Sequence, residues 1–215
     1  MKIMVVGASG TAGSQIAKEA LSRGHQVTAV GRTEEKLTDL AFEGDVQLFI
    51  KDAFDLTKDE LAAHDVVVHA ISQAPDKAYL QTDLTTKWIA EFRETTTPRF
   101  FFILGAGSLV TGEDKHDVID DIRLLPGHES WIGIPENQFY QLKFLRDVKN
   151  VNWVGVSPGF EFHAGENEAF KLGKDELLYS DNGESATDSR ALAIAVVDEI
   201  ENPQHHNERF HVVNA

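Results

Sequence analysis

Residues 1–32 constrain the fold more strongly than any other part of the chain. An apolar run at residues 3–6 stops at a glycine-rich turn, and beyond it apolar residues recur at helical spacing as far as Arg23 and Gly24. A second β-branched run follows at residues 27–30. This order of strand, helix and strand predicts the opening unit of an α/β protein with a parallel sheet.

The turn between the first strand and the helix carries three glycines at positions i, i+3 and i+6. One glycine permits the tight path, a second lets a diphosphate approach the backbone, and a third brings helix and strand together. The free N–H groups of the first helical turn then face the phosphates, assisted by the helix dipole. The alternative is a turn that only joins strand to helix, which needs fewer glycines. The residues predicted to hold the diphosphate of a dinucleotide are Gly7, Ser9, Gly10, Thr11, Ala12 and Gly13.

The G-x-x-G-x-x-G spacing of this turn differs from the G-x-G-x-x-G dinucleotide fingerprint. In this respect the sequence resembles the short-chain dehydrogenase/reductase superfamily, in its atypical and extended branches. The resemblance implies a nicotinamide cofactor.

The end of the second predicted strand bears on the choice between NADP and NAD. Enzymes that select NAD usually carry an acid there for the ribose 2′-hydroxyl, whereas NADP enzymes place an arginine for the 2′-phosphate. Here the strand ends at Arg32 and Thr33, and Glu34 and Glu35 fall in the first turn of the next helix, where acids are favoured anyway. We predict that Arg32 binds a 2′-phosphate, with Thr33 beside it and Lys36 as a lesser candidate. NAD remains possible, because Arg32 could instead pair with Glu34 or Glu35.

The rest of the chain continues the alternation of strands and helices. Further strands are predicted at residues 46–50, 65–71, 99–104, 151–157 and 209–213, and helices at residues 33–41, 79–94, 136–148 and 187–200. We therefore expect a Rossmann-type doubly wound parallel sheet that forms a single domain over residues 1–215, with residues 158–186 as a small substrate-facing flap. Residues 109–135 are the least regular part, and a connection of that length is typical of a lid.

In such sheets ligands bind at the carboxyl ends of the strands. Asp52 and Ala53 follow the third strand and are placed to bind an adenine ring, while Pro158 and Phe160 follow the sixth and are placed to meet the nicotinamide amide. His69 lies within the fourth strand, so we expect a hydrogen-bonded core histidine and not a catalytic base. The cofactor residues predicted at these strand ends are Asp52, Ala53, Ala70, Ile71, Ser72, Pro158 and Phe160.

The expected catalytic residues of a short-chain enzyme are only partly present. In that family a serine after the fifth strand polarises the substrate carbonyl, and Ser108 occupies this place, although a turn serine bonded to its own backbone is equally consistent. A tyrosine and a lysine should follow at i and i+4 on the next helix, where the lysine lowers the pKa of the tyrosine and holds the ribose. The residue four before Lys143 is Phe139, and Tyr140 lies three before it. Ser108 and Tyr140 are the catalytic candidates, and Lys143 is a candidate cofactor ligand.

Composition excludes several classes of function. The net charge of −15, from 35 acids against 20 bases, disfavours nucleic acid and anionic membranes as partners. There is no cysteine, which excludes disulfides, thiolate metal sites and cysteine catalysis. No metal motif is present, and His116 stands among acids at a spacing that matches none. We expect no leader and no membrane span, and therefore a cytoplasmic protein. We also expect it to be a monomer or a homodimer.

A closer resemblance extends over nearly the whole chain. The matching segments are residues 7–13, 31–32, 51–53, 105–108, 156–158, 172–174 and 183–185. They resemble the NADH-flavin reductase group, which comprises atypical short-chain proteins similar to biliverdin reductase B and NmrA-like proteins. The resemblance implies an NAD(P)H-dependent reductase of a flavin or a similar planar acceptor, such as a quinone, by direct hydride transfer. A flavin can take its proton from water, so this chemistry requires no tyrosine acid.

Two other functions remain open from the sequence. NmrA-like proteins use this fold to sense the redox state of NADP and bind a protein partner without catalysis. A sugar-nucleotide epimerase or dehydratase is the other alternative, but it requires Tyr140 as an acid and a larger C-terminal lobe.

Overall fold

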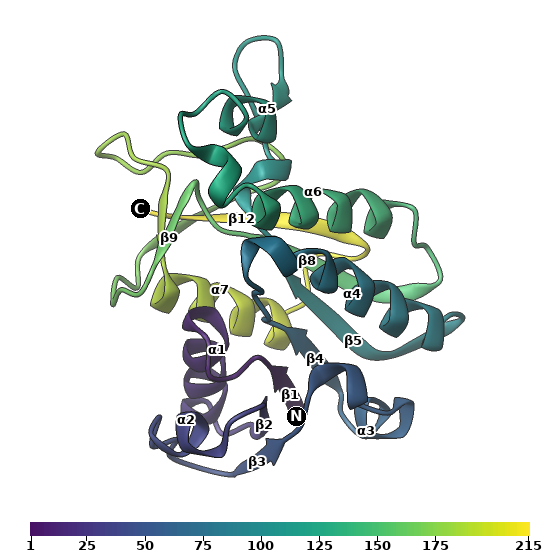
Figure 1. Ribbon diagram of the computed structural model, residues 1–215. Helices are drawn as coiled ribbons and strands as arrows, with labels where there is room; N and C mark the ends of the chain where they lie inside the picture. The colour runs from purple at the N-terminus through teal and green to yellow at the C-terminus, as the bar shows by residue number, and fades with distance from the viewer.

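A sheet of eight strands forms the centre of the molecule, and the first strand of the chain lies within it (Figure 1). The computed structural model describes residues 1–215. The strands of the sheet are β1 (Lys2–Val6), β2 (Gln26–Gly31), β3 (Val46–Ile50), β4 (Val66–His69), β5 (Thr95–Ile103), β8 (Val151–Ser157), β10 (Phe170–Gly173) and β12 (Glu208–Asn214). Their spatial order is β10-β12-β8-β5-β4-β1-β2-β3, and only β10 is antiparallel to its neighbour. The chain reverses its direction of winding between β1 and β4, so the binding crevice of such a sheet is expected there.

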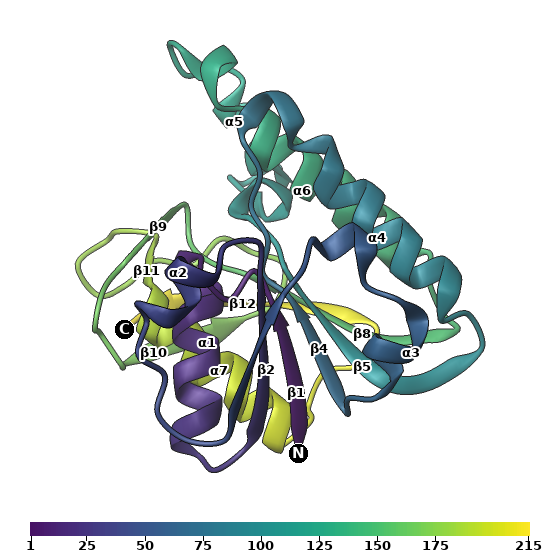
Figure 2. The ribbon, with the colours of Figure 1, turned by 60° about the horizontal axis from the view of Figure 1, so that its bottom comes forward.

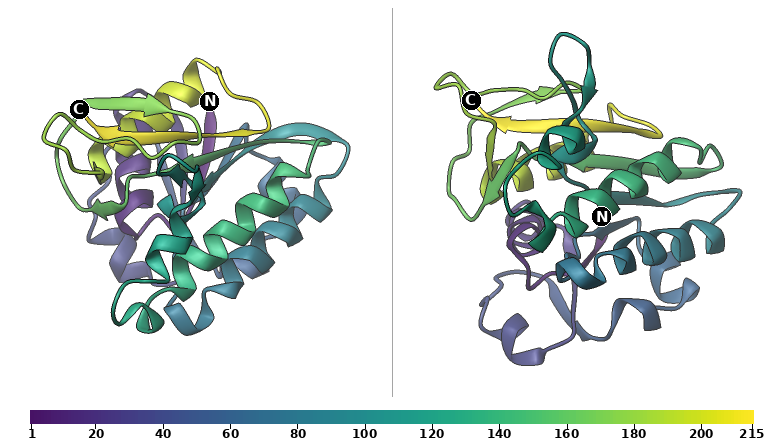
Figure 3. Two further views of the ribbon diagram at one scale, coloured as in Figure 1. Left: turned by 90° about the horizontal axis from the view of Figure 1, so that it is seen from above. Right: turned by 45° about the horizontal axis from the view of Figure 1, so that its top comes forward.

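Helices cover both faces of the sheet (Figure 2). They are α1 (Thr11–Ser22), α2 (Glu34–Thr38), α3 (Lys58–Ala62), α4 (Tyr79–Glu91), α5 (Val118–Ile122), α6 (Gly133–Arg146) and α7 (Ser189–Glu201). Four 3₁₀ turns are η1 (Ala53–Asp55), η2 (Pro75–Lys77), η3 (Ala106–Ser108) and η4 (His128–Ser130). Helices α1 and α7 pack together on one face, and α4 and α6 run side by side on the other (Figure 3). No helix is both long enough and apolar enough to cross a bilayer.

The strand β1 shows why both faces need helices. Ile3 and Val5 belong to the core beneath α1 and α7, whereas Met4 and Val6 belong to the core beneath α4 and α6. All four side chains are buried. Side chains alternate across a strand, so a continuous apolar run must be covered on both sides. Each such side chain contributes about 1.5–3 kcal/mol on burial. The prediction of a Rossmann-type parallel sheet is confirmed.

The structure differs from the predicted elements mainly in the second half of the chain. Residues 170–173 form β10, which completes the edge of the main sheet by pairing with β12, although the sequence placed them in a flap. The remaining strands of that region, β9 (Glu161–His163) and β11 (Ala186–Asp188), pair with each other. The expectation that residues 158–186 face the substrate stays a prediction.

Residues 109–135 are more regular than the sequence indicated. They contain the hairpin of β6 (Val110–Thr111) and β7 (His116–Asp117), followed by α5 and η4. Leu109, Val118 and Ile122 are buried in a third core cluster together with Phe139 of α6. The first half of this segment is therefore packed structure and not a mobile connection. Helix α2 is shorter than predicted and ends at Thr38, and α6 begins at Gly133, three residues earlier than predicted.

His69 is a core residue, as expected, but the predicted hydrogen bond is absent. Its side chain is 1% exposed and neither ring nitrogen has a partner. The ring packs edge-on against Trp88, with centroids 5.3 Å apart, and lies 5.8 Å from the ring of Phe102. Burial lowers the pKa of His69 to about 4, so the imidazole is neutral.

We expect His69 to make the fold sensitive to mild acid. The pKa is lower in the folded state than the ordinary value of about 6.5, so the unfolded chain binds more protons and stability is lost as pH falls from about 6.5 towards 4. Between pH 7 and pH 5 the loss through His69 should be about 2 kcal/mol. In His69→Leu, denaturant unfolding at the two pH values should show a loss smaller by that amount. His206→Leu, at an exposed histidine, is the control, and an equal loss in wild type and His69→Leu would contradict the prediction.

Candidate active site

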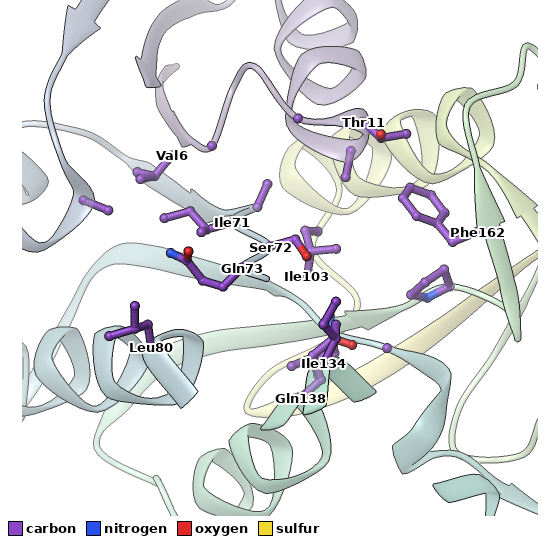
Figure 4. Close-up of a pocket in the computed structure, with 18 of the residues that line it drawn as sticks. Val6, Thr11, Ile71, Ser72, Gln73, Leu80, Ile103, Ile134, Gln138 and Phe162 are labelled. Atoms are coloured by element: carbon purple, nitrogen blue, oxygen red, sulfur yellow. The ribbon is translucent and has the colours of Figure 1, made fainter. Parts of the chain in front are cut away.

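A cavity of about 830 Å³ lies at the carboxyl ends of the parallel strands and crosses the point where the winding reverses (Figure 4). One end is formed by the turn before α1 and by the ends of β2 and β3, and the other by the ends of β5 and β8 and by the start of α6. The sequence predicted the cofactor-binding residues at these same strand ends. Of the predicted cofactor residues, those that line the cavity are Gly7, Ser9, Gly10, Thr11, Ala12, Arg32, Asp52, Ala53, Ala70, Ile71, Ser72, Pro158 and Phe160.

The three glycines of the turn have separate roles. Gly7 has φ +91°, and a Cβ there would lie 2.6 Å from the carbonyl oxygen of Ala70 on the neighbouring strand end. A Cβ on Gly13 would lie 2.2 Å from the carbonyl oxygen of Gly7. Gly13 does not line the cavity, so it brings α1 against the turn, while Gly10 forms part of the cavity wall. Any side chain at Gly7 or Gly13 would push the helix away from the sheet.

The first turn of α1 presents unused hydrogen-bond donors. The backbone N–H groups of Ser9, Thr11, Ala12 and Gly13 donate to no protein acceptor, whereas that of Ser14 bonds to Gly10. No side chain caps the helix and its first turn contains no acid. Free donors and the positive end of a helix dipole, next to a cavity, fit the diphosphate of a dinucleotide.

The charged residues at the same end of the cavity fit an adenosine moiety. Arg32 lines the cavity and forms no ion pair, so the alternative pairing with Glu34 or Glu35 is not observed. Thr33 lies outside the cavity. One carboxylate oxygen of Asp52 accepts the Phe54 N–H at 2.9 Å, which leaves the other free to accept from an adenine amine.

The backbone N–H groups after β8, where a contact with the nicotinamide amide was predicted, bond within the protein. The N–H of Gly159 donates to Thr187 Oγ1 at 2.7 Å, and that of Phe160 donates to Ser185 Oγ at 3.2 Å. Pro158 has no N–H. The N–H groups of Gly159 and Phe160 are therefore already used within the protein, although Pro158, Gly159 and Phe160 all line the cavity.

Ser108 does not lie in the cavity. It is 4% exposed, and its hydroxyl accepts a hydrogen bond from Nη1 of the buried Arg209 at 3.3 Å. The same Nη1 donates to Ser157 Oγ at 2.9 Å, and Ser157 Oγ donates to the carbonyl of Gly105. The Ser108 hydroxyl also lies 3.4 Å from the carbonyl of Gly105, three residues earlier, so the alternative of a turn serine bonded to its own backbone is observed. The geometry assigns Ser108 to the support of the cavity wall and not to contact with a substrate carbonyl.

Tyr140 and Lys143 also lie outside the cavity. Tyr140 is 49% exposed and packs its ring against Phe139, and Lys143 places Nζ 4.2 Å from the ring centroid of Phe139. An α-helix has 3.6 residues per turn, so Ile134 and Gln138 lie on one face of α6, and Tyr140 and Lys143 lie on a different face. The proposed tyrosine acid and ribose ligand are therefore not brought together with the cofactor residues.

Several cavity residues were not identified from the sequence. Helices α4 and α6, with the segments before them, contribute much of the cavity wall at the end formed by β5 and β8. These residues are Lys77, Leu80, Ile134, Pro135 and Gln138, and Phe162 adds a further wall (Figure 4). Trp131, which the sequence offered as a pocket or partner-surface residue, and Gln73, at the carboxyl edge of the fourth strand, also line the cavity. The i, i+4 spacing of Ile134 and Gln138 was visible, but nothing in the sequence indicated which face of that helix meets the sheet edge.

No group of three or more histidine, cysteine, aspartate or glutamate side chains is arranged to hold an ion. His116 bonds Asp114 at 2.6 Å and Asp121 at 3.0 Å on the surface hairpin. The hydrogen bond that His116 donates to the Asp114 carboxylate, and then its interaction with Asp121, raise the pKa of His116 to about 9. This cluster is a salt-bridged surface group.

The parallel sheet, its crossover point and the glycine turn with free N–H groups define a Rossmann-type dinucleotide-binding protein. The chain belongs to the NAD(P)H-binding family, whose model matches residues 7–203. This confirms the predicted nicotinamide-binding fold.

Similar proteins span the full chain. The uncharacterized protein YwnB of Bacillus subtilis is 36% identical over 100% of this chain and 99% of its own. A Lactobacillus casei protein of known structure is 34% identical with a TM-score of 0.91, and a Streptococcus pneumoniae structure, a candidate NADH-flavin reductase by name, is 30% identical with a TM-score of 0.87; each match covers 100% of both chains. The family and these relatives support an NAD(P)H-dependent oxidoreductase.

Proposed function

We propose that the protein is an NADPH-dependent reductase of a flavin or a similar planar acceptor. One observation carries the proposal: beyond the glycine turn many of the lining residues are apolar or aromatic, with Gln73, Lys77 and Gln138 among the polar ones, and no tyrosine, histidine or glutamate lines the cavity. Its one carboxylate, Asp52, lies at the end formed by β3. Flat apolar walls suit stacked rings, whereas a sugar substrate requires converging polar groups and an acid.

The residues of the chain bind and orient the two rings. Bound reduced nicotinamide supplies a hydride, which a flavin accepts at N5 with a proton taken from water. Phe160, Ile134 and Leu80 provide apolar surface for the rings and exclude water from between them. The N–H groups at the start of α1 fix the diphosphate and so the position of the nicotinamide. Proximity and orientation supply most of the acceleration.

The test is anaerobic oxidation of NADPH by purified protein with riboflavin, FMN or a quinone as acceptor. We expect oxidation well above the rate without protein, and an equal rate for Tyr140→Phe, because that hydroxyl lies outside the cavity. Absence of turnover with every acceptor would overturn the proposal. Preferential binding of oxidised over reduced nucleotide without turnover would favour a regulator instead, and loss of a measured activity in Tyr140→Phe would favour an epimerase.

We further propose that Arg32 selects NADP over NAD. Arg32→Ala should weaken NADPH binding by about tenfold, because a charged hydrogen bond to phosphate contributes about 1.5–3 kcal/mol and this side chain is exposed to solvent. Binding of NADH should change by less than about twofold. Calorimetric titration with both nucleotides measures the ratio, and Lys36→Ala tests the lesser candidate. Equal weakening of NADPH and NADH binding in Arg32→Ala would contradict the assignment.

A further inference from the structure

Gln138 is the only polar side chain that α6 contributes to the cavity. The other two lining residues of this helix are Ile134 and Pro135. The neighbouring amides of the helix are used within the protein, since Asn137 Nδ2 donates to the carbonyl of Gly133 at 2.8 Å and Gln141 Nε2 donates to Thr85 Oγ1 at 2.8 Å. The carboxamide of Gln138 makes no hydrogen bond with the protein. Figure 4 shows Gln138 and Ile134 extending from one helix into the cavity.

The backbone that follows β5 leaves space for this carboxamide. A Cβ on Gly105 would lie 2.2 Å from Oε1 of Gln138, so any other residue at position 105 would displace the side chain. Gly105 is itself held in place, because its carbonyl accepts a hydrogen bond from Ser157 Oγ at 2.9 Å. A fixed backbone therefore lies next to a free amide, in a cavity whose apolar lining residues would stack against an acceptor ring.

We propose that the carboxamide of Gln138 binds the imide edge of the acceptor, so that the enzyme selects planar rings with an N–H next to a carbonyl. This inference rests on the proposed function. A primary amide presents a donor and an acceptor side by side, which matches an N–H and C=O pair such as that at N3 of a flavin. A quinone offers carbonyl acceptors without the N–H, and leaves the amide oxygen of Gln138 unpaired. A polar group that loses its partner on binding discriminates strongly between substrates.

The test compares riboflavin, N3-methylated riboflavin and a simple naphthoquinone in wild type and Gln138→Met. The substitution keeps the length of the side chain and removes both hydrogen-bonding groups. We expect kcat/KM for riboflavin to fall about tenfold, from the loss of paired hydrogen bonds. N3-methylation should cost wild type a similar factor and cost the variant nothing further, because both changes remove one interaction. The quinone rate should change by less than about twofold. Gln47→Met, at an exposed position on β3, is the matched control.

Three results separate this inference from the proposed function. Equal losses with riboflavin and the quinone would place Gln138 on the nicotinamide carboxamide and overturn the inference, as would wild-type indifference to N3-methylation. Riboflavin binding to the complex with oxidised NADP, followed by fluorescence quenching, gives the same comparison without turnover. Binding that depends on Gln138 in a protein that reduces nothing would keep the inference and overturn the proposed function.

Discussion

Thr11→Asp should abolish tight nucleotide binding while leaving the fold intact or slightly more stable. Thr11 is exposed, lies at the start of α1 and lines the cavity. A carboxylate there would face the diphosphate, and like charges about 4 Å apart repel by up to about 4 kcal/mol at an effective dielectric constant of about 20. We expect affinity for NADPH and NADH to fall by about 100-fold. The same carboxylate would stabilise the helix by about 0.3–1 kcal/mol, because the first turn of α1 has no acid.

The opposite signs of these two effects make the test decisive. Calorimetric titration measures binding, and thermal unfolding without nucleotide measures stability. Thr11→Asn, which is nearly the same size as aspartate but uncharged, is the matched control and should retain most of the affinity. If Thr11→Asp bound either nucleotide as tightly as Thr11→Asn, the N-terminus of α1 would not hold the phosphates, and the functional inference would fail with it.

Glu199→Gln should destabilise the protein by about 3 kcal/mol, because it leaves a buried arginine without its counter-ion. Arg99 Nη2 lies 2.5 Å from Glu199 Oε1, and the exposed fractions of the two side chains are 10% and 5%. Glu199 also accepts hydrogen bonds from the N–H groups of Gln204 and His205 and from the ring of His205. The pair joins β5 to α7 and the turn before β12, and neither residue lines the cavity.

For a chain of this length the expected loss corresponds to a melting temperature lower by roughly 9 °C. Glu176→Gln is the control, since its pair with Lys115 is largely exposed and contributes less than about 1 kcal/mol. Burial tends to raise the pKa of Glu199, but the hydrogen bonds from His205, Arg99 and Gln204 outweigh it and lower the pKa below the ordinary value. That stability is present above the ordinary carboxyl pKa and is lost as pH falls through the lowered one. A wild type no more acid-sensitive below pH 4 than Glu199→Gln would contradict this.

Local sequence was sufficient to predict the glycine turn and the strand ends that line the cavity. Gly7, Gly10 and Gly13 act through contacts within the same turn or with the adjacent strand end, so their spacing alone indicated the geometry that the structure shows. Arg32 and Asp52 were found in the same way, because the carboxyl end of a parallel strand always lies at the ligand edge. Such features depend on residues a few positions apart.

The acceptor end of the site depended on packing between distant segments. The rotation of α6 about its axis decides that Gln138 enters the cavity and that Tyr140 does not, and this rotation is fixed by packing against α4 and η3. The sequence left Ser108 open between a catalytic serine and a turn serine bonded to its own backbone, and it did not reveal Arg209, about a hundred positions away, as a further partner of the hydroxyl.

What the sequence by itself determined is the class of fold and the position of the cavity at the strand ends, because strand order, helix periodicity and the glycine turn are set by short-range chemistry. Only the tertiary structure decided which side chains face the acceptor, that β10 joins the main sheet, and that His69 is buried without a partner. These outcomes depend on how the helices and edge strands pack against one another. The packing energies that decide this arrangement come from residues far apart in the chain.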